Sequence, residues 1–483
     1  MALALLASLL GCSGEPSGAD GAPVPPYTTT EQGAEGSSDE RSGIGGGSND
    51  VVVAGAGAPV EPAIASPASE GSGGAIGLSA TEGTGGTEPG PPAATGGMGP
   101  VMPSDPSNAS PLWVGTWATG PQLTEPNNLP PAPGLANNTL RQKVLVTLAG
   151  NRVRLLLSNG FGNAPVTFNA VRIARAGAAS AIEPSTERAL LFGGSPSVTI
   201  PAGQTQLSDP LDYSLEALSQ LAITLQFGNV PADVTGHPGS RTTSYIMPGN
   251  AVSAASMPQA VTTDHWYFIT GIDVEVTAPS AAVVTLGDSI TDGRGSTTNG
   301  NDRWPDQLAR RLQANDTTRP VAVLNMGIGG NQVVSGGLGP TAVARYQRDV
   351  LEQRGVRWVI VLEGVNDIGN SSDAGIADRL ISAYEGFIDA AHARDIRVYG
   401  APILPFGGNG YGTPAHEAAR QAVNTWIRTS GRFDAVIDLD AAVRDPANPN
   451  QLLRAYDSGD FLHLSPAGYQ AMANAIDLAL FTP

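Results

Sequence analysis

Two residues near the C-terminus, Asp460 and His463, have types and a spacing that suggest chemistry. They stand three residues apart, just ahead of Ser465-Pro466. On a turn, this separation can bring the carboxylate to one imidazole nitrogen, which orients the ring and leaves the other nitrogen free to take a proton. By itself a histidine ahead of a helix is more often structural than catalytic, so the pair needs a partner from elsewhere in the chain.

Ser289 is the candidate nucleophile. It follows the apolar segment Val283-Val-Thr-Leu286, in the sequence Gly287-Asp-Ser-Ile-Thr-Asp-Gly293. A serine at the tip of a strand presents its hydroxyl at the mouth of a sheet, where a base can activate it. The motif differs from the Gly-x-Ser-x-Gly elbow of α/β-hydrolases because position 291 is Thr. Alone it is weak evidence, since a serine here can simply cap a helix.

Two further blocks could stabilise negative charge on a substrate oxygen. They are Asn325-Met-Gly-Ile-Gly-Gly-Asn331 and Glu363-Gly-Val-Asn-Asp367. Glycine lets a backbone N–H approach a substrate closely, and the side-chain amide of Asn366 donates a hydrogen bond without adding charge. Each block alone is also typical of a turn.

The segments that carry these blocks alternate between strand and helix after Ala281. Because strict alternation is typical of a parallel sheet with helices on both faces, the sites should form at the carboxyl ends of the strands. The expected strands cover 283–286, 321–324, 358–362, 397–399 and 435–438. The expected helices start at Asp302, with Trp304, Leu308 and Leu312 on one stripe, and then cover about 341–353, 376–394, 415–429 and the residues after Pro466.

Before Ala278 the pattern is short apolar alternation with turn residues such as Asn159-Gly160 between the segments. This pattern predicts an antiparallel β-sandwich or jelly roll. The expected strands are 139–148, 152–157, 166–174, 197–200, 221–226 and 267–276.

In this order the four blocks resemble the SGNH/GDSL hydrolase family, and the match covers residues 281–483. The resemblance implies an α/β, flavodoxin-like three-layer fold and hydrolysis of carboxylic esters through an acyl-enzyme. Ser289 would be the nucleophile and the first oxyanion donor through its own N–H. Gly330 N–H and the Asn366 side chain would be the second and third donors, and Asp460 and His463 would complete the triad.

The glycine is the assignment that the residues alone leave open, because Gly327 and Gly329 stand beside Gly330. The choice of Gly330 rests on the family pattern Asn-x-Gly-x-x-Gly-Asn.

No metal or other cofactor is expected. The five histidines form no His-Glu-x-x-His pair, and Cys12 is the single cysteine, so no soft site can be completed. We expect His392 and His416 to be surface or packing residues of helices. His237, in the β-rich region, is not expected to act near the active site.

The segments Trp113 to Gln122, Leu140-Arg-Gln142, Ser158 to Gly162 and Thr243-Ser-Tyr245 resemble a front domain in a bacterial branch of the family that includes acetyl-xylan-esterase-like members. This extends the resemblance to residues 112–483. Trp113, Trp117 and Phe161 could stack on sugar rings, although such aromatics are more often core residues. Deacylation of an esterified carbohydrate is therefore the leading hypothesis. A lipase or lysophospholipase is the alternative, and a non-catalytic surface binding protein is a third.

The first 110 residues have a different composition. They hold 23 of the 61 glycines, no Trp or Phe, and 12 acidic residues against one basic residue. Such a segment cannot bury enough apolar surface to fold, so we expect residues 13–110 to be a disordered tether. Cys12 follows a short apolar run, which resembles a lipobox, so residues 1–12 read as a lipoprotein-type signal.

We therefore expect a secreted or cell-surface protein that is attached to a bacterial membrane only through a lipid on Cys12, with a β-sandwich at 111–278 and a hydrolase domain at 279–483. The residues from Leu112 onward carry a net charge of about −7, which argues against a nucleic-acid partner. The expected substrate is a small-molecule or polysaccharide ester.

Overall fold

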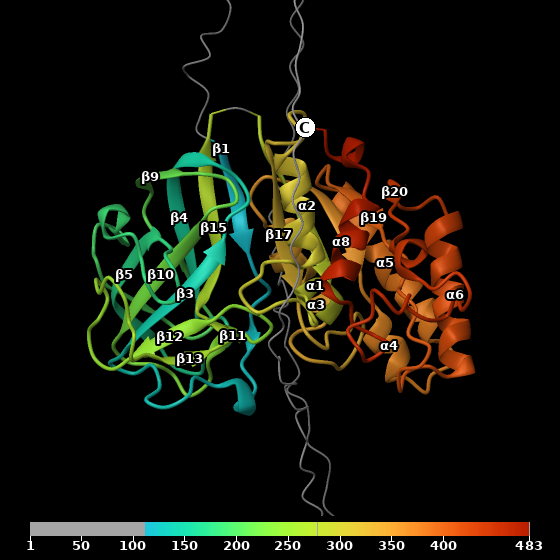
Figure 1. Cartoon of the computed structure of the whole chain (residues 1–483), viewed down its shortest axis with the longest axis horizontal. Helices are drawn as coiled ribbons and strands as arrows, with labels where there is room; N and C mark the ends of the chain where they lie inside the picture. Colours follow the sequence, from blue (N-terminus) through green and yellow to red (C-terminus); the bar gives the residue numbers. More distant parts are fainter. Residues whose placement is uncertain (1–111, 278, 483) are drawn as a thin grey trace, which may run out of the picture. The chain divides into compact units, whose positions relative to one another are not determined.

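The computed structural model describes residues 112–277 and 279–482. The expected signal segment, the tether and Cys12 lie outside the described residues. All described residues belong to one compact unit. We call residues 112–277 the β region and residues 279–482 the α/β region (Figure 1).

The β region is built from antiparallel sheets, as the sequence pattern predicts. One sheet has the order β1-β15-β4-β8 with β9 also paired to β4, and a second has the order β13-β12-β3-β10-β5-β6 with β7 also paired to β5. A small third sheet joins β14, β11 and β2. The strands are β1 (Leu112–Ala118), β2 (Gln122–Leu123), β3 (Thr139–Leu145), β4 (Gly150–Ser158), β5 (Val166–Arg175), β6 (Arg188–Leu190), β7 (Val198–Ile200), β8 (Thr205–Leu207), β9 (Leu211–Leu215), β10 (Gln220–Phe227), β11 (Thr235–His237), β12 (Ser244–Met247), β13 (Val261–Thr263), β14 (Trp266–Tyr267) and β15 (Ile269–Val276).

A cluster of three fully buried phenylalanines shows where the two larger sheets pack on each other. Phe168 on β5 and Phe227 on β10 belong to one sheet, and Phe268 directly precedes β15 of the other. Their ring centroids lie 5.1 to 5.8 Å apart, within the range of favourable aromatic pairs. The alternating burial along β4 fits one face turned to this core.

The α/β region contains a parallel sheet in the order β17-β16-β18-β19-β20. Every residue of β16 is buried, because strands covered by helices on both faces need apolar side chains on both. The elements are β16 (Ala281–Gly287), α1 (Ser289–Asp292), α2 (Trp304–Gln313), β17 (Val321–Gly327), α3 (Ala342–Tyr346), β18 (Val356–Leu362), α4 (Val365–Gly369), α5 (Ile376–His392), β19 (Arg397–Gly400), α6 (Pro414–Thr429), β20 (Ala435–Val436), α7 (Leu439–Val443) and α8 (Pro466–Asn474).

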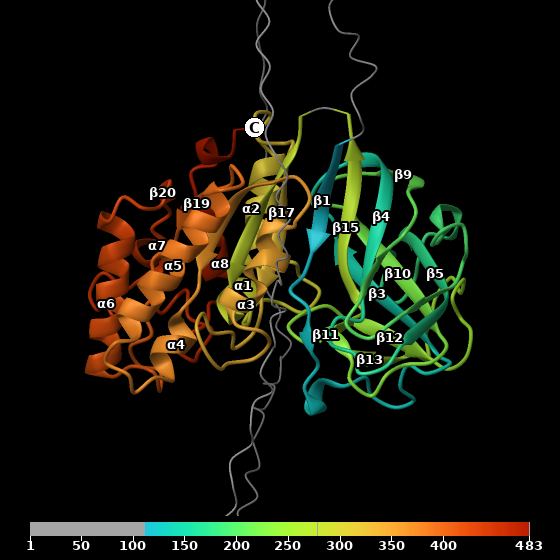
Figure 2. The ribbon, with the colours of Figure 1, turned by 180° about the vertical axis from the view of Figure 1, so that it is seen from behind.

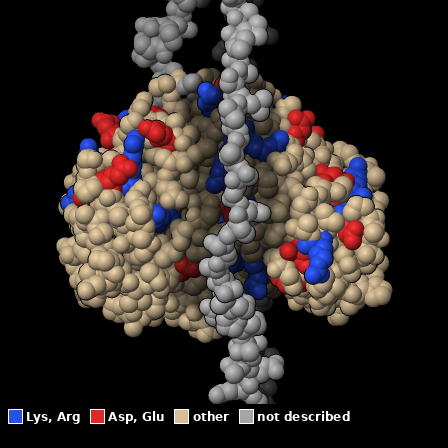
Figure 3. Space-filling view, viewed as in Figure 1, with Lys and Arg blue, Asp and Glu red and all other residues tan. Residues whose placement is uncertain are grey.

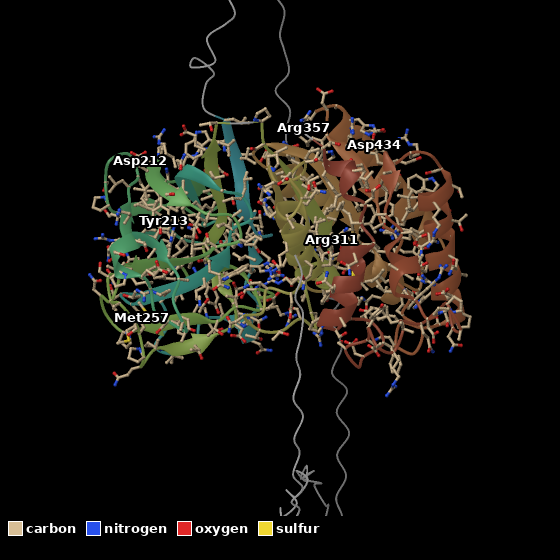
Figure 4. All side chains as sticks on the ribbon, turned by 45° about the horizontal axis from the view of Figure 1, so that its top comes forward. Asp212, Tyr213, Met257, Arg311, Arg357 and Asp434 are labelled. Carbon is tan, nitrogen blue, oxygen red and sulfur yellow. The ribbon has the colours of Figure 1, made fainter. Side chains whose placement is uncertain are left out.

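Helices cover both faces of this sheet. The chain moves one way from β16 to β17 and the other way from β18 to β20, so right-handed crossovers place α2 on the opposite face from α5 and α6. Accordingly α2 packs on α8, and α5 packs on α6 (Figure 2). Arg311 of α2 donates hydrogen bonds to Ala473 O and Ile476 O at the end of α8, which fixes this pair (Figure 4). The predicted three-layer α/β fold is confirmed.

The helix expected over 341–353 differs in detail. After α3 the chain forms a single π-helical turn over Gln347–Leu351. The spacing of apolar residues over so short a segment cannot distinguish this turn from a continued α-helix.

The carboxyl end of β16 is a topological switch point, because its neighbours β17 and β18 are reached in opposite directions. Open α/β sheets bind their ligands at such points. No helix within 112–277 and 279–482 is long and apolar enough to cross a membrane. On the face shown in Figure 3, the basic and acidic side chains of the described residues are interspersed.

Candidate active site

Ser289, His463 and Asp460 form a continuous hydrogen-bonded chain at the switch point. Ser289 Oγ lies 2.8 Å from His463 Nε2, and His463 Nδ1 lies 2.6 Å from Asp460 Oδ2. Ser289 and His463 are buried, with 7% and 6% of their surface exposed. The structure thus brings together a hydroxyl and an oriented imidazole that are 174 residues apart in the sequence.

The Asp460 carboxylate is held by its own turn. Its Oδ1 accepts hydrogen bonds from Leu462 N at 3.0 Å and His463 N at 2.8 Å, and Oδ2 remains for the imidazole. Burial acts to raise the pKa of Asp460, but the hydrogen bonds from His463 outweigh it, so the pKa lies below its usual value. Asp460 therefore stays ionised and keeps Nδ1 protonated.

The pKa of His463 is lowered from its ordinary value of 6.5, mainly by burial. Asp460 acts in the opposite direction, while the positive charges of Arg294 and Arg241 lower the pKa further. A neutral imidazole whose Nε2 faces a hydroxyl can accept its proton at neutral pH.

Ser289 is placed by the short helix α1, whose first residue it is. Asp288 caps this helix, because its side chain accepts a hydrogen bond from Ile290 N at 2.9 Å. Burial raises the pKa of Asp288 to about 7. The capping bond fixes the tight turn that follows β16.

Three N–H donors lie around the same cavity as the Ser289 hydroxyl. Among the described residues, neither Ser289 N nor Gly330 N donates a hydrogen bond to another protein group. Asn366 Nδ2 uses one N–H on Asn331 O at 2.9 Å, which leaves its other N–H free. The arrangement offers an oxygen anion two backbone donors and one amide donor.

The structure separates the roles of the three glycines. A side chain on Gly327 would come within 2.2 Å of Asp292 N, so this glycine permits close packing of α1. Gly329 and Gly330 both line the cavity. Gly330 also has a φ of 68°, a left-handed conformation that favours glycine.

A buried arginine ties together the strand ends that carry these groups. Arg345 donates to Gly287 O at 3.0 Å, Met326 O at 2.6 Å and Asn331 Oδ1 at 3.0 Å. It also pairs with Asp349 at 3.2 Å. One fully buried guanidinium therefore fixes the ends of β16 and β17 and the loop that holds Gly330. The family blocks contain no signal for this residue.

The cavity over Ser289 has a volume of about 430 Å³. Its wall comes from both regions, since loops of the β region complete it. The lining residues are Gln122, Glu125, Asn128, Pro238, Gly239, Arg241, His265, Ser289, Asp292, Arg294, Gly329, Gly330, Leu338, Asn366, Tyr411, Leu462 and His463. A cavity of about 400 Å³ at the amino ends of β18 and β19, near Arg357 and Asp434, has no serine in its lining (Figure 4).

His237, which was not expected to act near the active site, contacts a residue of the cavity wall without lining the cavity itself. His237 Nε2 lies 2.9 Å from Asp292 Oδ1, and Nδ1 lies 2.9 Å from Gly120 O. Asp292 ends the same short helix that Ser289 begins. A side chain on Gly239 would meet Asp292 Oδ2 at 1.6 Å, so only glycine allows this close approach. Sequence reasoning missed the contact because its partners lie 55 residues apart in different regions.

The other residues considered from the sequence lie elsewhere. Trp113, Trp117 and Phe161 are not in the lining of the cavity; Trp117 is buried against Trp266, and Arg154 covers the ring of Trp113. His392 pairs with Asp434, and His416 contacts two backbone carbonyls. Within the two described ranges, no group of three or more His, Cys, Asp or Glu could hold a metal ion.

The sequence of the site region matches a known family model. Residues 285–471, which include Ser289, Asn366, Asp460 and His463, match the GDSL-like lipase/acylhydrolase family. This segment is a GDSL-like lipase/acylhydrolase domain. The protein is accordingly a carboxylic ester hydrolase, as the resemblance of its sequence blocks implied. No curated protein matches the chain.

Three solved structures are similar to part of this chain. A lipolytic protein of the G-D-S-L family from Desulfitobacterium hafniense is 20% identical, with a TM-score of 0.33, and the match covers 41% of this chain and 97% of that one. An acylhydrolase from Bacteroides fragilis is 21% identical, with a TM-score of 0.32 over 42% of this chain and 89% of that one. An acetylxylan esterase from Geobacillus stearothermophilus is 22% identical, with a TM-score of 0.32 over 40% of this chain and 91% of that one.

Proposed function

We propose that this GDSL-like hydrolase removes short acyl groups, acetyl in particular, from esterified carbohydrate through an acyl-enzyme on Ser289. The observation that carries the proposal is the hydrogen-bonded chain from Ser289 Oγ through His463 to Asp460, with contacts of 2.8 and 2.6 Å. A nucleophile in contact with a base, and the base in contact with a third group, is the arrangement that nucleophilic catalysis requires.

In the first half of the reaction, His463 Nε2 takes the proton of Ser289 as Oγ attacks the ester carbonyl. The carbonyl oxygen becomes an anion and accepts hydrogen bonds from Ser289 N, Gly330 N and Asn366 Nδ2. The C–O bond to the alcohol then breaks. His463 passes its proton to the leaving alkoxide, so the sugar departs as a neutral alcohol and the acyl group remains on Ser289.

In the second half, water replaces the alcohol. His463 takes a proton from the water as its oxygen attacks the acyl-enzyme, and the same donors stabilise the second tetrahedral intermediate. The bond to Ser289 breaks, His463 returns the proton to Oγ, and a carboxylic acid leaves.

The lining of the cavity supports a polar alcohol portion. Most of its side chains can donate or accept hydrogen bonds, whereas aliphatic side chains contribute only Leu338, Leu462 and Pro238. A sugar presents hydroxyl groups to such a wall, while a long acyl chain needs a continuous apolar channel.

Ser289→Ala tests the mechanism, with Ser296→Ala as the matched control. Ser296 lies in the following loop, and its hydroxyl has no hydrogen-bond partner, so removing it should change turnover less than threefold. Ser289→Ala should abolish hydrolysis of 4-nitrophenyl acetate and the burst of acyl-enzyme formation. Normal turnover in Ser289→Ala would refute the assignment.

A lipase or lysophospholipase is the second candidate. It is favoured by Leu338, which lines the cavity and is 47% exposed. A series of 4-nitrophenyl esters from two to twelve carbons separates the two functions. Highest kcat/KM for acetate supports deacetylation, whereas a preference for eight or more carbons supports the lipase. Any turnover that depends on Ser289 excludes a purely binding role.

We also propose that the protein is anchored at the cell surface through Cys12. The support is the short apolar run that precedes this cysteine in the sequence. Metabolic labelling with a radioactive fatty acid should mark the full chain but not Cys12→Ala. Equal labelling of the two proteins would contradict the anchor.

A further inference from the structure

Two arginines in the wall of the cavity have no acidic partner within 112–277 and 279–482. Arg241 comes from the β region and Arg294 from the loop after α1, and both line the cavity that contains Ser289 and His463. Among the described residues, neither guanidinium forms a salt bridge or donates a hydrogen bond to a protein group. Arg241 Nε is also buried without a partner. Arg294 is exposed to solvent, whereas Arg241 is partly buried, and an unpaired, partly buried guanidinium is costly unless a ligand supplies the acceptor.

The backbone that carries Arg241 is held in place from both regions. Asn299 N donates to Arg241 O at 2.9 Å, and Asn299 Oδ1 accepts from Thr243 N at 2.9 Å. Arg303 donates to Ser240 O on the preceding residue. Arg241 itself has a φ of 51°, a conformation that side-chain-bearing residues seldom adopt. Such conformations persist where the surrounding structure enforces them, often at ligand sites.

The carboxylates around the cavity already have partners. Glu125 accepts hydrogen bonds from Gln122 Nε2 and, at 3.0 Å, from Asn128 Nδ2. Asp292 Oδ1 lies 2.9 Å from His237 Nε2, while its Oδ2 has no hydrogen-bond partner among the described residues. These acidic groups are therefore fixed by neighbours other than Arg241 and Arg294, and neither lies within salt-bridge distance of the two arginines. Among the described residues of the wall, Arg241 Nε and Asp292 Oδ2 are the buried polar atoms without a hydrogen-bond partner, while Arg294 is exposed.

His265 adds an acceptor beside them. Its Nδ1 lies 2.6 Å from Pro238 O and must donate to that carbonyl, which leaves Nε2 as an acceptor. His265 lines the same cavity. A sugar hydroxyl could donate to this nitrogen while an acidic group on the same sugar meets the arginines.

We propose that Arg241 and Arg294 form an anion subsite, so that the preferred substrate is an acylated acidic sugar whose carboxylate they bind while its ester lies at Ser289. The inference rests on the proposed deacetylation and names the class of sugar. Guanidinium is suited to this task because it binds a carboxylate through two parallel hydrogen bonds and stays charged.

The test compares two substrates on the full-length protein. They are methyl glycosides of glucuronic acid and of glucose, each with one acetyl group on the same hydroxyl, so that they differ only in carboxylate against CH₂OH at carbon 6. We expect the wild-type protein to have a kcat/KM roughly 10- to 100-fold higher for the acidic substrate, as charge-assisted hydrogen bonds provide. Added salt should reduce this ratio.

Arg241→Gln should reduce the ratio of kcat/KM between the acidic and the neutral glycoside about tenfold or more, through a higher KM for the acidic one. Arg241→Lys should restore part of this ratio, because lysine supplies the charge without the two parallel N–H donors of a guanidinium. Arg188→Gln is the control for net charge, since Arg188 is exposed on β6 and bonds only backbone carbonyls. It should leave the ratio unchanged.

Several results would overturn the subsite. Equal kcat/KM for the two glycosides, or a ratio that Arg241→Gln does not alter, would end it while leaving the deacetylation intact. Loss of the Arg241 charge should shift the pH profile equally for both substrates, and such a shift with an unaltered ratio would limit the arginine to the electrostatics of His463. Hydrolysis of an anionic lysophospholipid but of neither glycoside would refute the subsite and the deacetylation together.

Discussion

Replacing Asn366 with alanine gives a quantitative test of the oxyanion site. Of the three donors, Ser289 N and Gly330 N belong to the backbone and remain in any variant. Asn366 Nδ2 already spends one N–H on Asn331 O at 2.9 Å, so a single donor toward the cavity is lost. Loss of one such donor costs about 10²- to 10³-fold in kcat, or roughly 3 to 4 kcal/mol. We expect about a 100-fold fall in kcat with a small change in KM.

The matched control is Asn370→Ala. Asn370 follows the same helix, α4, and its amide contacts Asn366 O at 2.9 Å and Tyr411 Oη at 3.0 Å. Its side chain is not part of the cavity wall, so its removal should lower kcat less than about tenfold. Asn366→Asp should be slower than Asn366→Ala, because a carboxylate repels the developing anion.

The assay is steady-state hydrolysis of 4-nitrophenyl acetate together with urea unfolding of each variant. The unfolding data show whether a fall in kcat reflects a damaged fold. If Asn366→Ala keeps kcat within threefold of the wild type, the amide is not an oxyanion donor. If KM rises while kcat is unchanged, the amide binds the ground state as strongly as the transition state.

Further changes probe the base, the cap and the buried cation. His463 must be neutral to act and its pKa lies below 6.5, so activity should reach half its plateau below pH 6.5. Asp460→Asn should lower the plateau about 100-fold or more and should move the acid side of the pH–activity profile to still lower pH. An upward shift would contradict the conclusion that Asp460 raises the pKa of His463. Burial raises the pKa of Asp288 to about 7, so its contribution to stability is present at low pH and is lost as the pH rises through 7. Urea titrations should show that the unfolding free energy falls between pH 5 and pH 8, and that this fall is smaller in Asp288→Asn than in the wild type by about 2 kcal/mol. An equal fall in the two proteins would contradict the raised pKa of Asp288. Arg345→Leu leaves the buried acceptors Gly287 O, Met326 O and Asn331 Oδ1 without this donor, while Asp349 keeps its pair with Arg348. Urea unfolding should show a loss of about 3 to 5 kcal/mol, and a loss under 1 kcal/mol would show that the network does not hold the site together.

Much of the fold could be predicted because its signals are local. Strands such as β16 and β18 are mostly apolar, and α2 places Trp304, Leu308 and Leu312 on one buried stripe. The parallel sheet and the positions of the blocks at its strand ends follow from this alternation. Short strands such as β2, β11 and β14 have two or three residues, too few for any periodicity to appear.

The parts of the site that escaped prediction depend on long-range packing. Asp460 and His463 carry a local signal because they share a turn. The contacts of His237 and Arg345 depend on which loops meet, and neither residue lies in a motif with a fixed spacing to Ser289. The glycine block could be predicted only in part. The sequence shows where the block lies, but only three-dimensional packing distinguishes Gly327, which packs against Asp292, from Gly330 beside the cavity.

The loop around Gly239 and Arg241 has a consequence for attempts to engineer this hydrolase. It forms one wall of the cavity but supplies none of the groups that would move protons, so directed evolution at His265 can retune selectivity without removing a reacting group, whereas changes at Arg241 also alter the pKa of His463. Gly239 itself has no such freedom, because any side chain would collide with Asp292. A truncated enzyme that lacks the β region would therefore lose that wall of the cavity and the positions at which its substrate selectivity could be changed.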